Sequence, residues 1–193
     1  MEEALEAYDK AIEINPRYEA AWYNKGNTLG SLGRYEEALE TYDKAIEINP
    51  QNGVAWNNKG ETLGSLGRYE EALEAYDKAI EINLQNGVAW VAWYNKGNTL
   101  WSLGRLEEAL KAYDKAIEIN PQFEEAWHNK GAALWSLGRS EEALEAYDKA
   151  IEINPRLKEA WYNKGVILWS LGRLEEALEA YDKAGEFNPA VKN

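Results

Sequence analysis

The sequence predicts an all-α protein in which tandem helical hairpins stack into a solenoid. One observation is a repeat: tryptophan recurs at intervals of 34 residues with one interval of 37, and phrases such as EINP at 47–50 and 152–155 recur with it. A second is that apolar residues within each interval follow helical spacing over two segments, which indicates two helices per repeat. The recurring tryptophans are Trp22, Trp56, Trp93, Trp127 and Trp161.

The two helices of a repeat have recognisable ends. In the first complete repeat, the first helix is expected over residues 21–32, followed by Gly33, which can adopt the left-handed conformation that ends a helix. The second helix is expected over 35–49, because two acidic residues in its first turn favour the positive end of a helix. Pro50 then stops it.

Glycine recurs in the middle of each predicted first helix, where it costs about 1 kcal/mol relative to alanine. Close approach of two helices supplies a steric reason for keeping it. We expect Ala38 and Ala45 of the second helix to be the small partners that allow this approach, with Trp22 and Tyr42 filling the space beside them. The glycines are Gly26, Gly60, Gly97, Gly131 and Gly165.

These residues give the chain a family resemblance. It resembles the tetratricopeptide repeat family, whose pattern places tryptophan, leucine and glycine, tyrosine, alanines and a proline at set intervals. The matching residues of the first complete repeat are Trp22, Gly26, Leu29, Ala38, Tyr42, Ala45 and Pro50. The resemblance implies a right-handed superhelix of antiparallel hairpins, with about eleven helices in a single array over 1–193. It divides the array into a lone second helix at 1–18 and five hairpins at 19–52, 53–87, 88–123, 124–157 and 158–193.

The chain departs from the family pattern in a few places. A lysine stands three residues after each tryptophan where the pattern has leucine, so we expect its alkyl stem on apolar surface and its ammonium in water. Three residues are inserted near 88–93, and we expect them to lengthen the loop or the helix start upstream of Trp93. Leu84 replaces a proline, which predicts a looser joint, and Gly185 with Phe187 predicts a fraying last helix.

The family resemblance also implies a binding surface, because first helices line the concave side of such superhelices. Side chains that would face this groove change along the chain from amides to aromatic rings. Asparagine can donate to and accept from the backbone of an extended peptide, and exposed rings suit a proline-rich or glycan ligand. The predicted groove residues are Tyr23, Asn24, Asn27, Asn58, Tyr94, Asn95, Asn98, Trp101, His128, Asn129, Trp135, Tyr162, Asn163 and Trp169.

A purely structural interpretation of the same residues stays open. The asparagines can instead hydrogen-bond across neighbouring first helices, and the tryptophans can fill the space between helices. His128 stands where three other repeats have tyrosine and has no nucleophile unique to its repeat, so it favours packing over catalysis.

Composition excludes several classes of function. With 34 acidic and 21 basic side chains the net charge is −13, which disfavours nucleic acid and anionic membranes and favours protein or peptide partners. The chain has no cysteine and one histidine, so no zinc site and no cofactor site is expected. Nearly identical repeats offer no singular catalytic constellation, so we predict a scaffold and not an enzyme. If Met1 is the true start, the absence of a signal segment predicts a cytoplasmic protein.

Self-assembly is the alternative function. The chain begins and ends on a predicted second helix, so both ends of the array are expected to be uncapped and to favour homo-oligomers or filaments by end-to-end contact. Leu178 and Tyr181 are expected to be exposed at one of these ends. The same pattern also fits a fragment of a longer array or an engineered piece of one.

Overall fold

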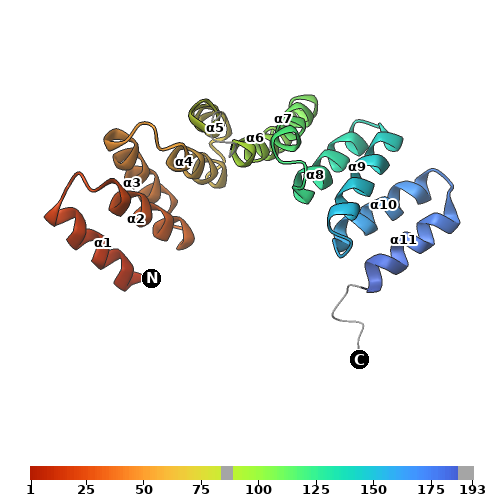
Figure 1. Cartoon of the computed structure of the whole chain (residues 1–193), viewed down its shortest axis with the longest axis horizontal. Helices are drawn as coiled ribbons and strands as arrows, with labels where there is room; N and C mark the ends of the chain where they lie inside the picture. Colours follow the sequence, from red (N-terminus) through yellow and green to blue (C-terminus); the bar gives the residue numbers. More distant parts are fainter. Residues whose placement is uncertain (84–88, 187–193) are drawn as a thin grey trace. The chain divides into compact units, whose positions relative to one another are not determined.

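The computed structural model describes residues 1–83 and 89–186, and all the regular structure in that part of the chain is α-helical. Consecutive helices pair as antiparallel hairpins (Figure 1), which confirms the predicted fold class. The eleven described helices are α1 (Glu2–Ile14), α2 (Glu19–Ser31), α3 (Tyr35–Ile48), α4 (Gly53–Ser65), α5 (Tyr69–Asn83), α6 (Trp90–Ser102), α7 (Leu106–Ile119), α8 (Glu124–Ser136), α9 (Ser140–Ile153), α10 (Lys158–Ser170) and α11 (Leu174–Glu186).

The chain forms two compact units, residues 1–99 and 100–193, and the division falls inside α6. In unit 1, α2 pairs with α3 and α4 with α5, while α1 packs on α2 and α3 packs on α4. In unit 2, α8 pairs with α9 and α10 with α11, while α7 packs on α8 and α9 packs on α10. The second helices α3 and α9 are therefore each held by two hairpins, their own and the next.

Every hairpin turn ends its first helix in the predicted way. Gly33 has a φ of 74°, and its amide donates to the carbonyl of Gly30 at 3.0 Å. The amide of Arg34 reaches back to Leu29 at 2.9 Å. Only glycine adopts this left-handed conformation without strain. The equivalent glycines with positive φ are Gly67, Gly104, Gly138 and Gly172.

A tyrosine ring lies directly on the glycine of the first helix. A Cβ atom placed on Gly26 would lie 2.7 Å from Tyr42 Cε1, and one placed on Gly60 would lie 2.6 Å from Tyr76 Cε1. Ala38 and Ala45 are fully buried, as expected of small partners. The glycine nevertheless meets the ring and not an alanine, so the steric reason inferred from the sequence is only partly right.

The tryptophan of each first helix is partly buried, and four of these tryptophans hydrogen-bond to the preceding loop. Trp22 Nε1 donates to the carbonyl of Pro16 at 2.9 Å, and Trp161 Nε1 donates to that of Pro155 at 2.9 Å. Both prolines follow a second helix, so the indole fixes the connection between one hairpin and the next. The same bond joins Trp56 to Pro50 and Trp127 to Pro121. Leu84, which replaces this proline at the end of the second hairpin, lies outside the described residues.

The repeated lysines pair their ammonium groups with carboxylates, so the expectation that these groups are solvated by water alone was wrong. Lys25 Nζ lies 2.5 Å from Asp9 Oδ1 of the preceding second helix, and Lys164 makes the same contact with Asp148. These lysine side chains are only 23% exposed. The other pairs are Lys59 with Asp43, Lys96 with Asp77 and Lys130 with Asp114. In four of the five repeats the ammonium also lies over the ring of the tryptophan three residues earlier, 5.1–5.5 Å from its centre.

The inserted residues leave the third first helix unchanged in length. Helix α6 begins at Trp90, three residues before Trp93, just as α2 begins at Glu19, three residues before Trp22. The extra residues therefore precede the helix. At the other end of unit 2, α11 includes Gly185, whereas Phe187 lies outside the described residues.

The contact between the tyrosine ring and the glycine predicts how a substitution of the glycine changes stability. Replacing Gly60 with alanine forces a methyl group into the Tyr76 ring, so we expect the G60A variant to lose about 1–3 kcal/mol of unfolding free energy. The matched control is Gly64→Ala in the same helix, where the nearest atom to the new Cβ is Thr99 Oγ1 at 4.0 Å. G64A should be neutral or up to about 1 kcal/mol more stable. Urea denaturation followed by circular dichroism measures both, and equal midpoints would contradict the proposed packing.

Candidate functional site

The predicted groove residues share one face of each first helix. Because each residue of an α-helix turns by about 100°, residues 23, 24, 27 and 30 of α2 lie together, opposite Trp22, Lys25 and Leu29. We call the side that carries Asn27 and its equivalents the amide face. Most of the predicted residues are partly buried there, whereas Tyr162 and Trp169 are 55% and 56% exposed.

Asn27 is the centre of a polar network in unit 1. The Tyr42 hydroxyl donates to Asn27 Oδ1 at 2.8 Å, and Asn58 Nδ2 donates to the same oxygen at 2.9 Å. Asn58 Nδ2 also lies 3.2 Å from the Tyr23 hydroxyl oxygen. The network therefore joins α2, α3 and α4. Burial beside Tyr23 raises the pKa of Tyr42, so this hydroxyl keeps its proton.

The network continues to the next first helix. Asn95 Nδ2 donates to Asn57 Oδ1 at 3.2 Å, and Asn57 Nδ2 donates to Asn58 Oδ1 at 3.3 Å. Asn95 also hydrogen-bonds the carboxylate of Glu61. These bonds correspond to the structural interpretation of the asparagines, since they link neighbouring first helices. The side chain of Asn24 makes no such bond within the described residues.

A hollow of about 420 Å³ lies on the amide face of unit 1. It contains the predicted residues Asn27 and Asn58 and also Glu61, which the sequence-based prediction missed. Glu61 could have been found, because it is the one acidic residue at a position held elsewhere by asparagine, alanine or valine. Removal of water raises the pKa of Glu61, although the hydrogen bond from Asn95 acts in the opposite direction. The lining residues are Asn27, Gly30, Ser31, Tyr35, Tyr42, Asn58, Glu61, Thr62 and Ser65.

Unit 2 has rings at several equivalent positions. His128 lies edge-on to Tyr147, with ring centres 5.4 Å apart, and its buried Nδ1 has no hydrogen-bond partner among the described residues. Burial lowers the pKa of His128, and the nearby carboxylate of Glu159 opposes that shift. Burial also raises the pKa of Tyr147 to about 12, partly offset by a hydrogen bond with Asn163. This group therefore resembles the Tyr42 network, with a histidine in place of Tyr23.

Tryptophan replaces glycine on the amide face of unit 2. Trp135 and Trp169 occupy the position that Gly30 holds in α2, and Tyr162 lies on the same face of α10. Trp135 and Trp101 are partly buried, while Tyr162 and Trp169 are exposed. We call Trp135, Tyr162 and Trp169 the aromatic strip. Its rings belong to α8 and α10, which pack against each other.

Neither a metal cluster nor a membrane-spanning helix occurs in the described part of the chain. Within 1–83 and 89–186, no group of three or more histidine, aspartate or glutamate side chains could hold a metal ion. No helix in those ranges is both long and apolar enough to cross a membrane.

Sequence comparison identifies the family. Tetratricopeptide repeat profiles match residues 19–52, 53–86 and 90–123, and further profiles of these repeats match 128–190 and 1–33. The chain belongs to the tetratricopeptide repeat family. Proteins built of these repeats are typically non-catalytic scaffolds, and this chain is a tetratricopeptide repeat scaffold for protein–protein interaction.

Individual relatives agree with this assignment. Uncharacterized protein MJ0572 of Methanocaldococcus jannaschii is 58% identical over 36 residues, which is 19% of this chain and 42% of that protein. Among solved structures, YrrB, described as a tetratricopeptide repeat protein with an unusual peptide-binding site, is 32% identical with a TM-score of 0.73. That match covers 97% of this chain and 95% of YrrB. MamA is 25% identical with a TM-score of 0.76, over 84% of this chain and 93% of MamA.

The histidine network gives a pH prediction. The pKa of His128 is lower in the folded than in the unfolded chain. As the pH falls through about 6.5, the folded chain therefore binds fewer protons than the unfolded chain does. Stability from this group is therefore lost on acidification. The unfolding free energy of the wild type should fall between pH 7.5 and 5.5. In the variant His128→Tyr, which has the tyrosine of three other repeats, this fall should be smaller by at most about 1.4 kcal/mol. Urea titrations at both pH values measure it, and an identical fall in both proteins would contradict the assignment.

Proposed function

We propose that the scaffold holds an extended peptide segment against the amide face of its first helices. In unit 1 this face has a polar hollow of about 420 Å³, whose rim carries amide, hydroxyl and carboxylate groups. Such groups can pair with the backbone of an extended chain, which offers alternating donors and acceptors. The side chain of Asn24 is the polar group best placed to do so, because Asn27 and Asn58 bond to their neighbours and Glu61 accepts a hydrogen bond from Asn95.

The aromatic strip of unit 2 is the observation that carries the proposal. Tyr162 and Trp169 each expose more than half of their surface on one helix face, and Trp135 stands at the same repeat position one hairpin earlier. Large rings exposed together on a polar surface mark interaction sites, because burying them against a partner removes apolar area from water. Their spacing suits a ligand with flat apolar groups, such as a proline-rich peptide.

Two further observations support this choice. The first helices of the two units carry different side chains at equivalent repeat positions, which uniform packing does not require. The relative YrrB, 32% identical over almost the whole chain, is described as having a peptide-binding site. That description belongs to YrrB, and its transfer to the amide face of this chain is part of the proposal.

A double variant tests the peptide site. Trp135→Ala combined with Trp169→Ala removes two rings of the aromatic strip, so binding of peptides selected from a proline-rich display library should weaken about tenfold or more. Affinity is measured by fluorescence anisotropy, and circular dichroism checks that the helices remain. The matched control is Leu171→Ala with Leu174→Ala, two exposed apolar residues outside the strip. Unchanged affinity in the tryptophan variant, or equal loss in the control, would discard the peptide site.

Self-association is a second candidate, favoured by one exposed leucine. The leucine near the start of each second helix is covered by the following hairpin, so its exposure is 6% or 7% in α1, α3, α5, α7 and α9. Its equivalent in α11, Leu178, is 56% exposed, and Leu171 and Leu174 beside it are 40% and 49% exposed. We call these three leucines the end patch. Tyr181, expected to be exposed with Leu178, instead packs on Gly165, where a Cβ would lie 2.7 Å from its ring.

The end patch makes its own prediction. If copies associate through it, sedimentation velocity over a hundredfold concentration range should show species larger than the 21.9 kDa monomer. Leu174→Lys with Leu178→Lys should return the protein to a monomer, because each lysine places a charge in the contact. Trp135→Ala with Trp169→Ala serves as the control and should leave the assembly unchanged. A wild-type protein that stays monomeric throughout would remove this candidate.

A further inference from the structure

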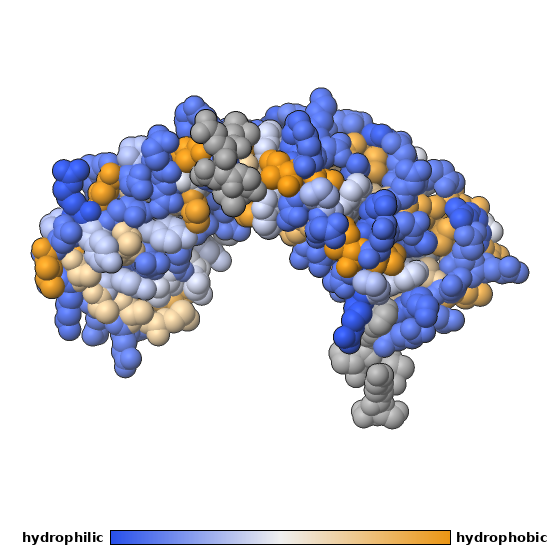
Figure 2. Space-filling view, in the orientation of Figure 1, coloured by the Kyte–Doolittle hydropathy of each residue, from blue (hydrophilic) through white to orange (hydrophobic). Residues whose placement is uncertain are grey.

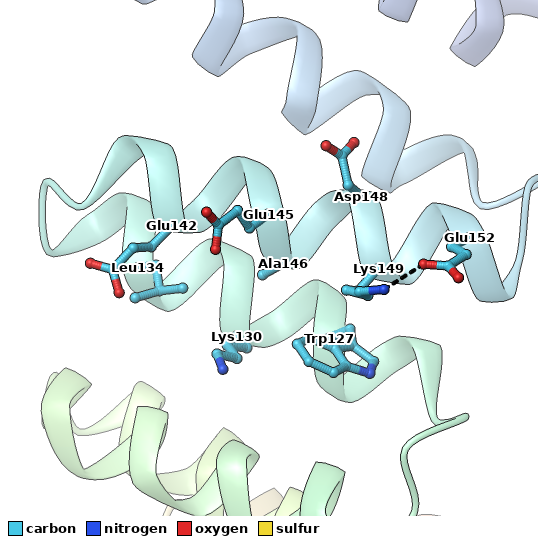
Figure 3. A pocket seen from close by; sticks show the side chains of 9 residues that line it. All are labelled: Trp127, Lys130, Leu134, Glu142, Glu145, Ala146, Asp148, Lys149 and Glu152. Carbon is cyan, nitrogen blue, oxygen red and sulfur yellow. Dashed lines mark hydrogen bonds and ion pairs between the residues drawn. The ribbon is translucent and has the colours of Figure 1, made fainter.

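Three hairpins have a hollow on the side opposite the amide face. The hollow between α8 and α9 measures about 510 Å³ (Figure 3), and those between α2 and α3 and between α4 and α5 measure about 440 and 430 Å³. Each is lined by the tryptophan, lysine and leucine of the first helix and by the outward residues of the second. We call them the back pockets. Their residues recur at the same repeat positions, so one kind of ligand group would fit all three.

The base of each back pocket is mainly apolar, and Thr41 replaces the alanine in the pocket between α2 and α3. In the pocket of Figure 3, Leu134 and Ala146 are 1% and 2% exposed, and Trp127 lines the same hollow. Leu29 and Leu63 occupy the place of Leu134 in the other two pockets and are equally buried. An aliphatic chain laid into the pocket would therefore meet hydrocarbon at its base.

The rim of each back pocket is acidic. Four carboxylates and two ammonium groups line the pocket of Figure 3. Lys149 is paired with Glu152 at 2.6 Å, and Lys130 with Asp114 at 2.7 Å, while Glu142 accepts two bonds from Arg139. Both lysines of the rim are thus neutralised by partners.

One carboxylate of the rim remains without a cation. Glu145 makes no ion pair or hydrogen bond with any residue in the part of the chain that the structure describes. The same holds for Glu40 and Glu74 at the equivalent positions of the other two pockets. All three are exposed at the surface. Each back pocket therefore combines an apolar base with one free negative charge at its edge.

We propose that the back pockets bind arginine side chains of a basic protein segment. An arginine has an alkyl stem that would cover the apolar base and a guanidinium that would reach the free glutamate. The planar guanidinium pairs with a carboxylate through two parallel hydrogen bonds, as Arg139 does with Glu142. The net charge of −13 would also draw a basic segment to the protein, and the face drawn in Figure 2 is mostly polar. This site is separate from the proposed peptide site, because the two lie on opposite faces of the hairpins.

The chain supplies the substitution that tests this proposal. Lys111 of α7 stands at the repeat position that Glu40, Glu74 and Glu145 hold in their helices. Lysine is therefore compatible with the second helix at this point. The triple variant Glu40→Lys, Glu74→Lys, Glu145→Lys places a positive charge, of the same sign as arginine, at every back pocket. It uses a residue that already occurs at this repeat position.

The probe is a fluorescein-labelled peptide of nine arginines, titrated at 0.15 M salt and followed by fluorescence anisotropy. We expect the triple variant to bind it at least tenfold more weakly than the wild type. The control variant Glu3→Lys, Glu13→Lys, Glu125→Lys makes the same change in net charge outside the pockets and should stay within threefold of the wild type. Equal weakening in both variants would show only general attraction between charges and would overturn the proposal, as would a wild type that does not bind.

Two further measurements test the guanidinium and the face that binds it. A peptide of nine lysines has the same charge without the guanidinium, so it should bind at least threefold more weakly, and equal binding would overturn the assignment to arginine. The variant Trp135→Ala with Trp169→Ala should bind the arginine peptide like the wild type. If the proposed peptide site on the amide face proved wrong, this result would therefore still test the back pockets. Loss of arginine-peptide binding in that variant would overturn the assignment to the back pockets and place the site on the other face.

Discussion

In four of the hairpins, a tyrosine ring of the second helix contacts a glycine of the first, and the rest of the hairpin depends on this constraint. The ring fills the space where a side chain would stand, so the two helices approach closely and their alanines become buried. Because the ring is fixed there, its hydroxyl emerges on the amide face, where Tyr42 reaches Asn27 and Tyr147 meets Asn163. The position of the core ring thus determines the geometry of the polar network on the amide face.

A different set of contacts joins one hairpin to the next. In four of the five repeats, the lysine of the first helix lies between the tryptophan of its own repeat and the aspartate of the preceding second helix. An isolated surface ion pair contributes little, but here the lysine side chain is only 19–24% exposed and its ammonium also lies over a ring. The indole nitrogen of the tryptophan holds the intervening loop through the proline carbonyl. Core packing within a hairpin and charge pairing between hairpins are therefore performed by separate residues of the same helix.

Much of this could be predicted from the sequence, because the repeat fixes the helices, their ends and the faces they bury. Gly33 ends α2 as its position in the pattern indicates, and Asn27 and Asn58 lie on one face as their spacing requires. The role of Lys25 was mispredicted because its partner, Asp9, is sixteen residues away on another helix, and helical spacing says nothing of such a pair. The sequence does show that Glu61 is the one acidic residue at its repeat position, but its raised pKa arises from the helices around it, which the repeat pattern does not describe.

The shared oxygen of Asn27 has a mechanical consequence. An amide oxygen has two lone pairs, and both are occupied, one by the hydroxyl of α3 and the other by the amide of α4. A partner that donates a hydrogen bond to this atom must first displace a bond that ties two hairpins together. A ligand that used this atom would therefore loosen the joint between α2 and α4, whereas a ligand that paired with other groups of the amide face would leave the joint intact.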